Sequence, residues 1–290
     1  MRNIITLFSF ILIITSCDVV EGPYEIETPD MTPIDTNTYV KKILIEDFTG
    51  HTCSNCPAAA RELEAIHDVY GDQIIGIAIH ATNFAVPWTG SGTFEYDFRT
   101  QWGEKWSDFF GISSLPSGMV NRIGYPNNEH NLGKDKWQEA VIAELEKIID
   151  FGMRIESDMT NKNITIKTKV LNITEGDYKL VVCLTESNII NWQKDGNDDV
   201  SDYEHNHALR TVLIDEDLST SFSYNIGDEI TTVINFDLTS LEQSNNEYSS
   251  NEGGVGNIGE WDSSNMSVIA YIYDNITKEI LQVEENHLNN

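Results

Sequence analysis

The stretch KILIEDFTGHTCSNCPAAARELEAI, residues 42–66, joins an apolar run to a run of helix-forming residues through two cysteines. Lys42–Phe48 predicts a buried strand, and Pro57–Ile66 predicts a helix. Cys53 and Cys56 therefore lie where a strand turns into a helix. Free backbone N–H groups and the positive end of the helix dipole at such a position stabilise a thiolate, which is the reactive form of cysteine. The pattern indicates a redox-active cysteine pair.

The residues that follow alternate between strand and helix patterns. Gln73–Ala81 predicts a second buried strand, and Gly118–Arg122 predicts a short third one. Aromatic residues spaced three or four apart predict a helix over Tyr96–Phe110, and an amphipathic pattern predicts another over Lys134–Ile149. This alternation is typical of an α/β sheet whose faces are covered by helices.

After Phe151 the apolar period changes to two, as in Asn163–Val170. Five further segments have the same strand character: Tyr178–Glu186, Leu209–Ile214, Ile230–Phe236, Met266–Tyr273 and Ile280–Glu284. Short strands joined by polar turns, without helices, predict an all-β sandwich. We therefore expect an α/β domain at residues 39–151 and a β-sandwich domain at residues 152–290.

The N-terminal residues predict export. Arg2 precedes the apolar run Ile4–Ile14, which is too short to span a membrane. The run ends in ITSC, residues 14–17, which resembles the bacterial lipobox. Residues 1–17 would then contain a lipoprotein signal peptide cut before Cys17, with lipid on the Cys17 thiol; ordinary secretory cleavage is the alternative. Residues 18–38 are acidic and lack apolar periodicity, so we expect a flexible tether there.

The charge of the chain narrows the partners. It has 47 acidic and 18 basic residues, a formal net charge of −29. Such a chain repels phosphate backbones, which excludes nucleic acid as an expected partner. The apolar content of 40%, with six Trp and eleven Phe, is ample for folded cores. We expect the acidity to serve solubility.

The strand, the CSNC motif and the helix together resemble the thioredoxin superfamily. Asp47 stands six residues before Cys53, and SLPS, residues 114–117, precedes a short predicted strand, as the superfamily's cis-proline segment does. The resemblance implies that Cys53 attacks a client, that Cys56 resolves the mixed disulfide, and that Asp47 manages the proton of Cys56. Pro116 would form part of the shelf on which the client lies.

Two departures from the superfamily pattern limit what the resemblance implies. His51-Thr52 replaces the aromatic residue that usually precedes the first cysteine, and an insertion over residues 81–95 lengthens the loop after the second strand. The resemblance therefore implies neither the direction of electron flow nor the client.

The whole chain also resembles a narrower family. The lipobox, TGHTCSNCP (residues 49–57), LPSGMVNR (115–122) and YEHNHALR (203–210) are similar to the Omp28-type outer membrane lipoproteins. This resemblance implies a thioredoxin-like domain followed by an immunoglobulin-like sandwich, anchored at the outer membrane by lipid. The family resemblance implies little about activity. The CSNC motif in its thioredoxin-like setting predicts a thiol–disulfide oxidoreductase acting on protein clients, with no cofactor beyond the Cys53–Cys56 disulfide.

Alternative interpretations of CSNC stay open. The pair could be a structural disulfide in a non-enzymatic surface or assembly lipoprotein that uses the fold as a scaffold. It could also be half of a metal site, for which the nearby candidates His51, His67 and His80 lack recognisable ligand spacing.

Three other features of the β-rich half have structural interpretations. Asp195–Asp202 alternates oxygen-bearing side chains, but Val200 stands where a calcium loop has glycine, so we expect a solvated acidic loop. His205-Asn206-His207 lacks a third ligand and is expected to be structural. Cys183 lies within an apolar strand and is expected to be a core residue.

Overall fold

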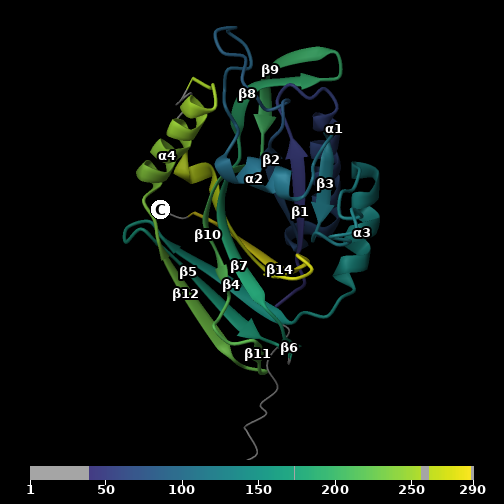
Figure 1. Ribbon diagram of the computed structural model, residues 1–290, viewed down its shortest axis with the longest axis vertical. Helices are drawn as coiled ribbons and strands as arrows, with labels where there is room; N and C mark the ends of the chain where they lie inside the picture. Colours follow the sequence, from purple (N-terminus) through teal and green to yellow (C-terminus); the bar gives the residue numbers. More distant parts are fainter. Residues whose placement is uncertain (1–38, 173, 256–260, 289–290) are drawn as a thin grey trace, which may run out of the picture. The chain divides into compact units, whose positions relative to one another are not determined.

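A seven-stranded mixed sheet runs through the protein in the strand order β14-β13-β7-β10-β2-β1-β3 (Figure 1). The computed structural model describes residues 39–172, 174–255 and 261–288, which belong to one unit, Asp35–Asn290. β1 (Ile43–Thr49) and β2 (Ile74–His80) are parallel, and α1 (Cys56–Tyr70) connects them. β3 (Ser117–Val120) pairs antiparallel with the other edge of β1. The predicted strand–helix–strand start is therefore confirmed.

The two faces of β1 are covered by different helices. Because successive strand residues point to opposite faces, Ile43 and Ile45 share a core with α1 and with α3 (Trp137–Leu145), whereas Leu44 and Phe48 share one with α2 (Gln101–Phe109). Single turns of 3-10 helix lie at Gly71–Gln73, Lys134–Lys136 and Ser263–Asn265. The sheet is thus covered on both faces where β1 ends and the cysteine loop, residues 50–56, begins.

α2 begins five residues later than the aromatic spacing predicts. Thr100 has an extended backbone, with φ −130° and ψ 153°, and its Oγ1 accepts the N–H of Gly103 at 2.9 Å. Such a cap satisfies a free N–H at the first turn and fixes the start of a helix. Before it, the Asp97 carboxylate accepts the backbone N–H of Arg99 at 3.0 Å, which holds this segment in a non-helical turn.

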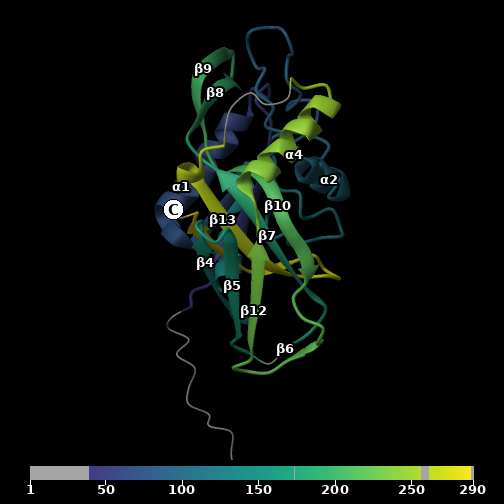
Figure 2. The same ribbon diagram turned by 90° about the vertical axis from the view of Figure 1, so that its left-hand side faces the viewer.

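The second half of the chain is rich in strands. β4 (Phe151–Asp158), β5 (Asn163–Val170) and β12 (Glu229–Asn235) form an antiparallel sheet in the order β12-β5-β4 (Figure 2). Alternate residues of β5 are buried, and Ile164 and Ile166 share a core with residues of β7 and β13. The remaining strands are β6 (Thr174–Glu175), β7 (Tyr178–Glu186), β8 (Ile189–Asp195), β9 (Asp198–His205), β10 (Ala208–Asp217), β11 (Ser223–Tyr224), β13 (Met266–Asp274) and β14 (Ile280–His287).

The expectation of no helix after Phe151 is wrong. α4 (Leu238–Asn251) is a helix of 14 residues, with the sequence LTSLEQSNNEYSSN. The segment has few apolar residues, so no amphipathic pattern marks it. Leu238 and Leu241 nevertheless pack against the core of the β-rich region, and Ser249 donates a hydrogen bond to Asp97 at 2.8 Å.

Strands from both sides of residue 151 share the main sheet. β10 joins β2 through Ala208 and Ala78, whose N–H donates to the His207 carbonyl at 2.8 Å. One apolar core contains Leu44 and Phe48 from the first half together with Tyr271 from the second. The boundary at residue 151 stays a prediction about folding units, but the halves share a sheet and a core.

Residues 1–38 lie outside the described residues, and with them the predicted signal peptide, Cys17 and the tether. Within the described ranges, no helix has the length and apolar character needed to cross a membrane.

Candidate functional site

Cys53 and Cys56 form a disulfide at the end of β1. Their sulfur atoms are 2.15 Å apart and their Cα atoms 5.4 Å apart. Cys56 is the first residue of α1, and Pro57 occupies the first turn, where a helix needs no N–H donor. Both cysteines are buried, with 3% of Cys53 and 1% of Cys56 exposed. The predicted pair is thus at the strand–helix junction, but neither residue is open to solvent.

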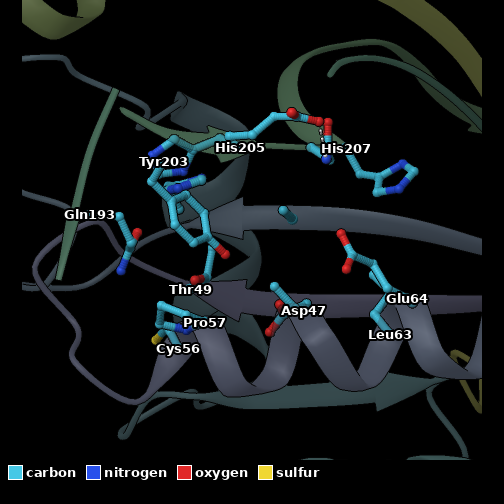
Figure 3. A pocket seen from close by; sticks show the side chains of 15 residues that line it. Asp47, Thr49, Cys56, Pro57, Leu63, Glu64, Gln193, Tyr203, His205 and His207 are labelled. Atoms are coloured by element: carbon cyan, nitrogen blue, oxygen red, sulfur yellow. Dashed lines mark hydrogen bonds between the residues drawn. The ribbon is translucent and has the colours of Figure 1, made fainter. Parts of the chain in front are cut away.

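Asp47 and Cys56 line the same small cavity, of about 50 Å³ (Figure 3). Asp47 is 2% exposed, and its Oδ1 has no hydrogen-bond partner among the residues that the structure describes. Burial raises the pKa of Asp47 well above its usual range, because the charged carboxylate loses its solvation. A carboxyl with a raised pKa holds a proton more readily than an exposed one, which suits a group that takes a proton from a nearby thiol.

Pro116 lies beside the end of β1. The Leu115–Pro116 peptide bond is cis. The next residue, Ser117, pairs with Phe48 across the β1–β3 ladder, so Pro116 stands next to the point where the cysteine loop leaves the sheet. The four residues that the thioredoxin resemblance selects therefore lie around one end of β1.

Three buried histidines lie around the same end of the sheet. His80 stacks on Phe98 with ring centroids 4.4 Å apart, and its centroid is 5.6 Å from that of His205. Burial lowers the pKa of His51 to about 4 and that of His205 to about 3, and it lowers the pKa of His80 well below its usual range. All three rings are therefore neutral at pH 7.

Of the three histidines considered for a metal site, the structure brings only two together. His51 and His80 both lie against Phe98, whereas His67 is on an exposed part of α1. In the portion of the chain that the structure describes, no group of three or more His, Cys, Asp or Glu residues could hold a metal ion.

The hairpin of β8 and β9 covers the cysteine loop, and in Figure 1 the two strands lie next to the end of β1. Its backbone bonds to the loop: the N–H of Lys194 donates to the His51 carbonyl at 2.9 Å, and the N–H of Gly196 donates to the Ser54 carbonyl at 2.8 Å. Among the residues that the structure describes, β8 and β9 pair only with each other, and this two-stranded unit is separate from the main sheet.

Side chains add to the hairpin's hold on the loop. Nε2 of Gln193 donates to the carbonyls of Cys53 at 3.1 Å and Gly50 at 3.3 Å, and Gln193 is 2% exposed. Arg61 on α1 forms an ion pair with Asp195 at 2.8 Å. Together these contacts explain why the disulfide is buried.

The predicted acidic loop is this hairpin. Asp195 ends β8 and Asp198 begins β9, so only Gly196 and Asn197 connect the strands. Gly196 has a φ of 62°, which suits glycine at the first central position of a tight hairpin turn. The segment is largely exposed, as a solvated acidic loop predicts, but Asp198–Asp202 is part of strand β9 and not of a loop.

The insertion after β2 holds the loop from another side. The N–H and Oγ1 of Thr52 both donate to the Phe84 carbonyl, at 3.0 and 2.8 Å. Gly50 permits this approach, because a Cβ there would lie 2.6 Å from the Phe84 carbonyl carbon.

Three residues of the site were not predicted from the sequence: Gln193, Tyr203 and His205, all of which line the cavity beside Cys56 (Figure 3). The sequence predicts only a structural role for His205, because the HNH segment lacks a third ligand. The unusual HNH sequence is the one local signal that could have drawn attention to it.

Comparison with known proteins identifies the family. The family model for outer membrane protein Omp28 matches residues 104–290. The match begins after the CSNC motif, so it does not itself bear on the cysteine pair. No curated protein matches the chain.

Two solved structures from the comparison share the fold. HBP35 of Porphyromonas gingivalis matches with a TM-score of 0.57 and 17% identity, over 86% of this chain and 76% of its own. A protein from Agrobacterium tumefaciens matches with a TM-score of 0.50 and 11% identity, over 86% and 96%. A domain of the outer membrane lipoprotein Omp28 from Porphyromonas gingivalis covers 49% of this chain and 91% of its own, with 16% identity and a TM-score of 0.26. The family match spans well over half of the sequence, and the chain belongs to the Omp28 family of outer membrane lipoproteins, as its motifs predicted.

Proposed function

We propose that this outer membrane lipoprotein is a thiol–disulfide oxidoreductase that acts through Cys53 and Cys56 on protein clients. The observation that carries the proposal is the position of the disulfide between the end of β1 and the first turn of α1, with Asp47 on the same cavity as Cys56. A thiolate near a helix N-terminus is stabilised, and a nearby proton acceptor helps the second thiol to react.

The roles follow from the order of the two cysteines. Cys53 precedes the helix and attacks the client, and Cys56 in the first turn attacks back to release it. Asp47 takes the proton of Cys56, and Pro116 supports the client beside β1. The parallel β1–α1–β2 unit supports a thioredoxin-like module over residues 39–151, and the facing sheets support an immunoglobulin-like sandwich over residues 152–290.

Cys17 is the residue that we propose as the lipid-bearing site. The lipobox-like ITSC segment and membership of an outer membrane lipoprotein family support it. The lipid would hold the oxidoreductase at the membrane, where its clients are other envelope proteins with thiols or disulfides.

A structural disulfide is the second candidate function of the pair. The burial of both cysteines favours it, because a buried disulfide is protected from exchange. Under the oxidoreductase proposal the tip of the β8–β9 hairpin moves aside when a client binds. The hairpin's separation from the main sheet supports such a movement.

The test measures how fast the protein, with dithiothreitol as reductant, reduces the disulfides of insulin. We expect catalysis by the wild type and about tenfold faster catalysis by Gln193→Ala, since loss of two hydrogen bonds to the loop weakens the cover by about 1–2 kcal/mol. Gln243→Ala is the matched control, because Gln243 lies on α4 and bonds Glu247. We expect it to act like the wild type.

Two outcomes of this test separate the claims. If neither the wild type nor Gln193→Ala accelerates insulin reduction over dithiothreitol alone, the pair is a structural disulfide. If both accelerate it equally, the pair is active but the hairpin is no barrier.

A further inference from the structure

Several polar atoms around the cavity beside the disulfide have no hydrogen-bond partner among the described residues. Asp47 of β1 and His205 of β9 line it together with Cys56 (Figure 3). His80 of β2 lines the same cavity. Among the described residues, no hydrogen-bond partner exists for Oδ1 of Asp47, for either ring nitrogen of His80, or for Nε2 of His205. The three residues are only 2% to 4% exposed.

A buried polar atom without a hydrogen-bond partner destabilises a protein. Several such atoms around one cavity therefore call for a physical explanation. Water satisfies such atoms where the space is polar and large enough, and one molecule needs roughly 10–15 Å³ of cavity volume. A volume of about 50 Å³ therefore has room for about three water molecules.

We propose that water in this cavity joins Asp47 to His80 and His205, and that the two histidines form a proton path that serves Cys56. The inference rests on the proposed oxidoreductase function and adds two positioning residues to it. It gives His205, in the HNH segment of the β-rich half, a role beside the cysteine pair of the first half.

The path acts in the step that releases the client, written here in the reducing direction. The S–H bond of Cys56 breaks and its proton passes through water to the Asp47 carboxylate. The Cys56 sulfur bonds to that of Cys53, the bond between Cys53 and the client sulfur breaks, and the client leaves as a thiolate that takes a proton from solvent. The cysteine pair is oxidised by two electrons, and the client disulfide is reduced.

Asp47 must then lose the proton that it has taken. A neutral imidazole accepts a proton on one nitrogen and releases the other from its second nitrogen, so His80 and His205 can pass the proton toward the hairpin. The nearby His51 and Arg210 each lower the pKa of His80 and of His205, so neither of these two rings keeps a positive charge for long. The other ionisable groups that line the cavity are Glu64, Tyr203, Glu204 and His207.

His205 lies at the base of the β8–β9 hairpin, away from the hairpin tip. It ends β9, pairs with Ile189 at the start of β8, and lies against Phe98 with ring centroids 4.3 Å apart. The hairpin tip that covers Cys53 lies at the opposite end of both strands. His205 can therefore stay at the cavity when the tip moves aside.

The experiment mixes the reduced full chain with dipyridyl disulfide, an uncharged probe that the acidic protein does not repel. Attack by Cys53 releases one pyridinethione, and attack by Cys56 releases a second, so one trace reports both steps. We expect His80→Asn and His205→Asn to slow the second release by at least about tenfold and to move its pH profile to higher pH. The first release should stay within about twofold of the wild type.

His67→Asn is the matched control, because His67 lies on the exposed part of α1 away from this cavity. Thermal unfolding checks each fold, and His205→Asn carries the test if His80→Asn does not fold. An unchanged rate and pH profile of the second release in a folded variant overturns the proton path alone. Failure of the wild type to release either pyridinethione overturns the oxidoreductase proposal and the path with it.

Discussion

Reduced Cys56→Ala protein is expected to stop at a mixed disulfide between Cys53 and its client, whereas Cys53→Ala should form none. The release of the client should slow by at least on the order of a hundredfold, because a held intramolecular thiol is replaced by dilute external thiol. Non-reducing electrophoresis of each variant with oxidised insulin, followed by mass measurement of the adduct, checks this.

Cys183→Ala is the control for the loss of a thiol, since Cys183 is a buried free cysteine in β7, as predicted. It should turn over clients like the wild type. A structural disulfide predicts a different pattern: either substitution at the pair would form no adduct and would cost about 2 kcal/mol of stability, as for a short closed loop.

The sequence pattern predicts a domain at residues 39–151, but because the two halves share a sheet and a core, these residues alone are expected not to fold cooperatively. β14 contacts residues that adjoin β1 and β3: Lys42, just before β1, forms an ion pair with Glu284, and the N–H of Ile280 donates to the carbonyl of Asn121, just after β3, at 2.9 Å. The fragment loses these contacts and the partners of Leu44 and Phe48 in the shared core. Exposing four large apolar side chains of this core, Leu44, Phe48, Ile77 and Ile79, costs about 6–12 kcal/mol, which is comparable to the whole stability of a typical domain.

Circular dichroism and thermal unfolding of the fragment, beside residues 39–290 as control, measure this effect. The longer chain should melt in one transition and the fragment in none. A sharp transition of the fragment near that of the longer chain would contradict the expectation and would support residue 151 as a boundary between independent domains.

The sequence predicts elements well where local pattern decides them. β5 has the bounds that its alternating apolar residues predict, β7 has the bounds of the predicted strand, and α1 contains the whole of the predicted helix. The predicted start of α2 is wrong, because the Asp97–Arg99 turn and the Thr100 cap outweigh the aromatic spacing. α4 was missed because its polar sequence carries no helical period.

The candidate site divides in the same way. Cys53, Cys56 and Asp47 can be predicted because they lie close together in the sequence around the end of β1, and Pro116 because it precedes a short predicted strand, as in the thioredoxin superfamily. Gln193 and His205 were not, because they reach the cavity only through the tertiary placement of the β8–β9 hairpin over the cysteine loop. The cover over the disulfide likewise depends on hydrogen bonds between residues about 140 positions apart, which no local pattern encodes.

The central claim is that Cys53 and Cys56 exchange electrons with clients, and a redox titration of the folded protein tests it most directly. The Cys183→Ala chain is equilibrated in glutathione and dithiothreitol buffers, and alkylation followed by mass measurement gives the fraction of reduced pair at each potential. A redox-active pair predicts a midpoint above about −300 mV, reached reversibly while the protein stays folded. A pair that stays oxidised below about −300 mV, and that is reduced only when the protein unfolds, would contradict the account.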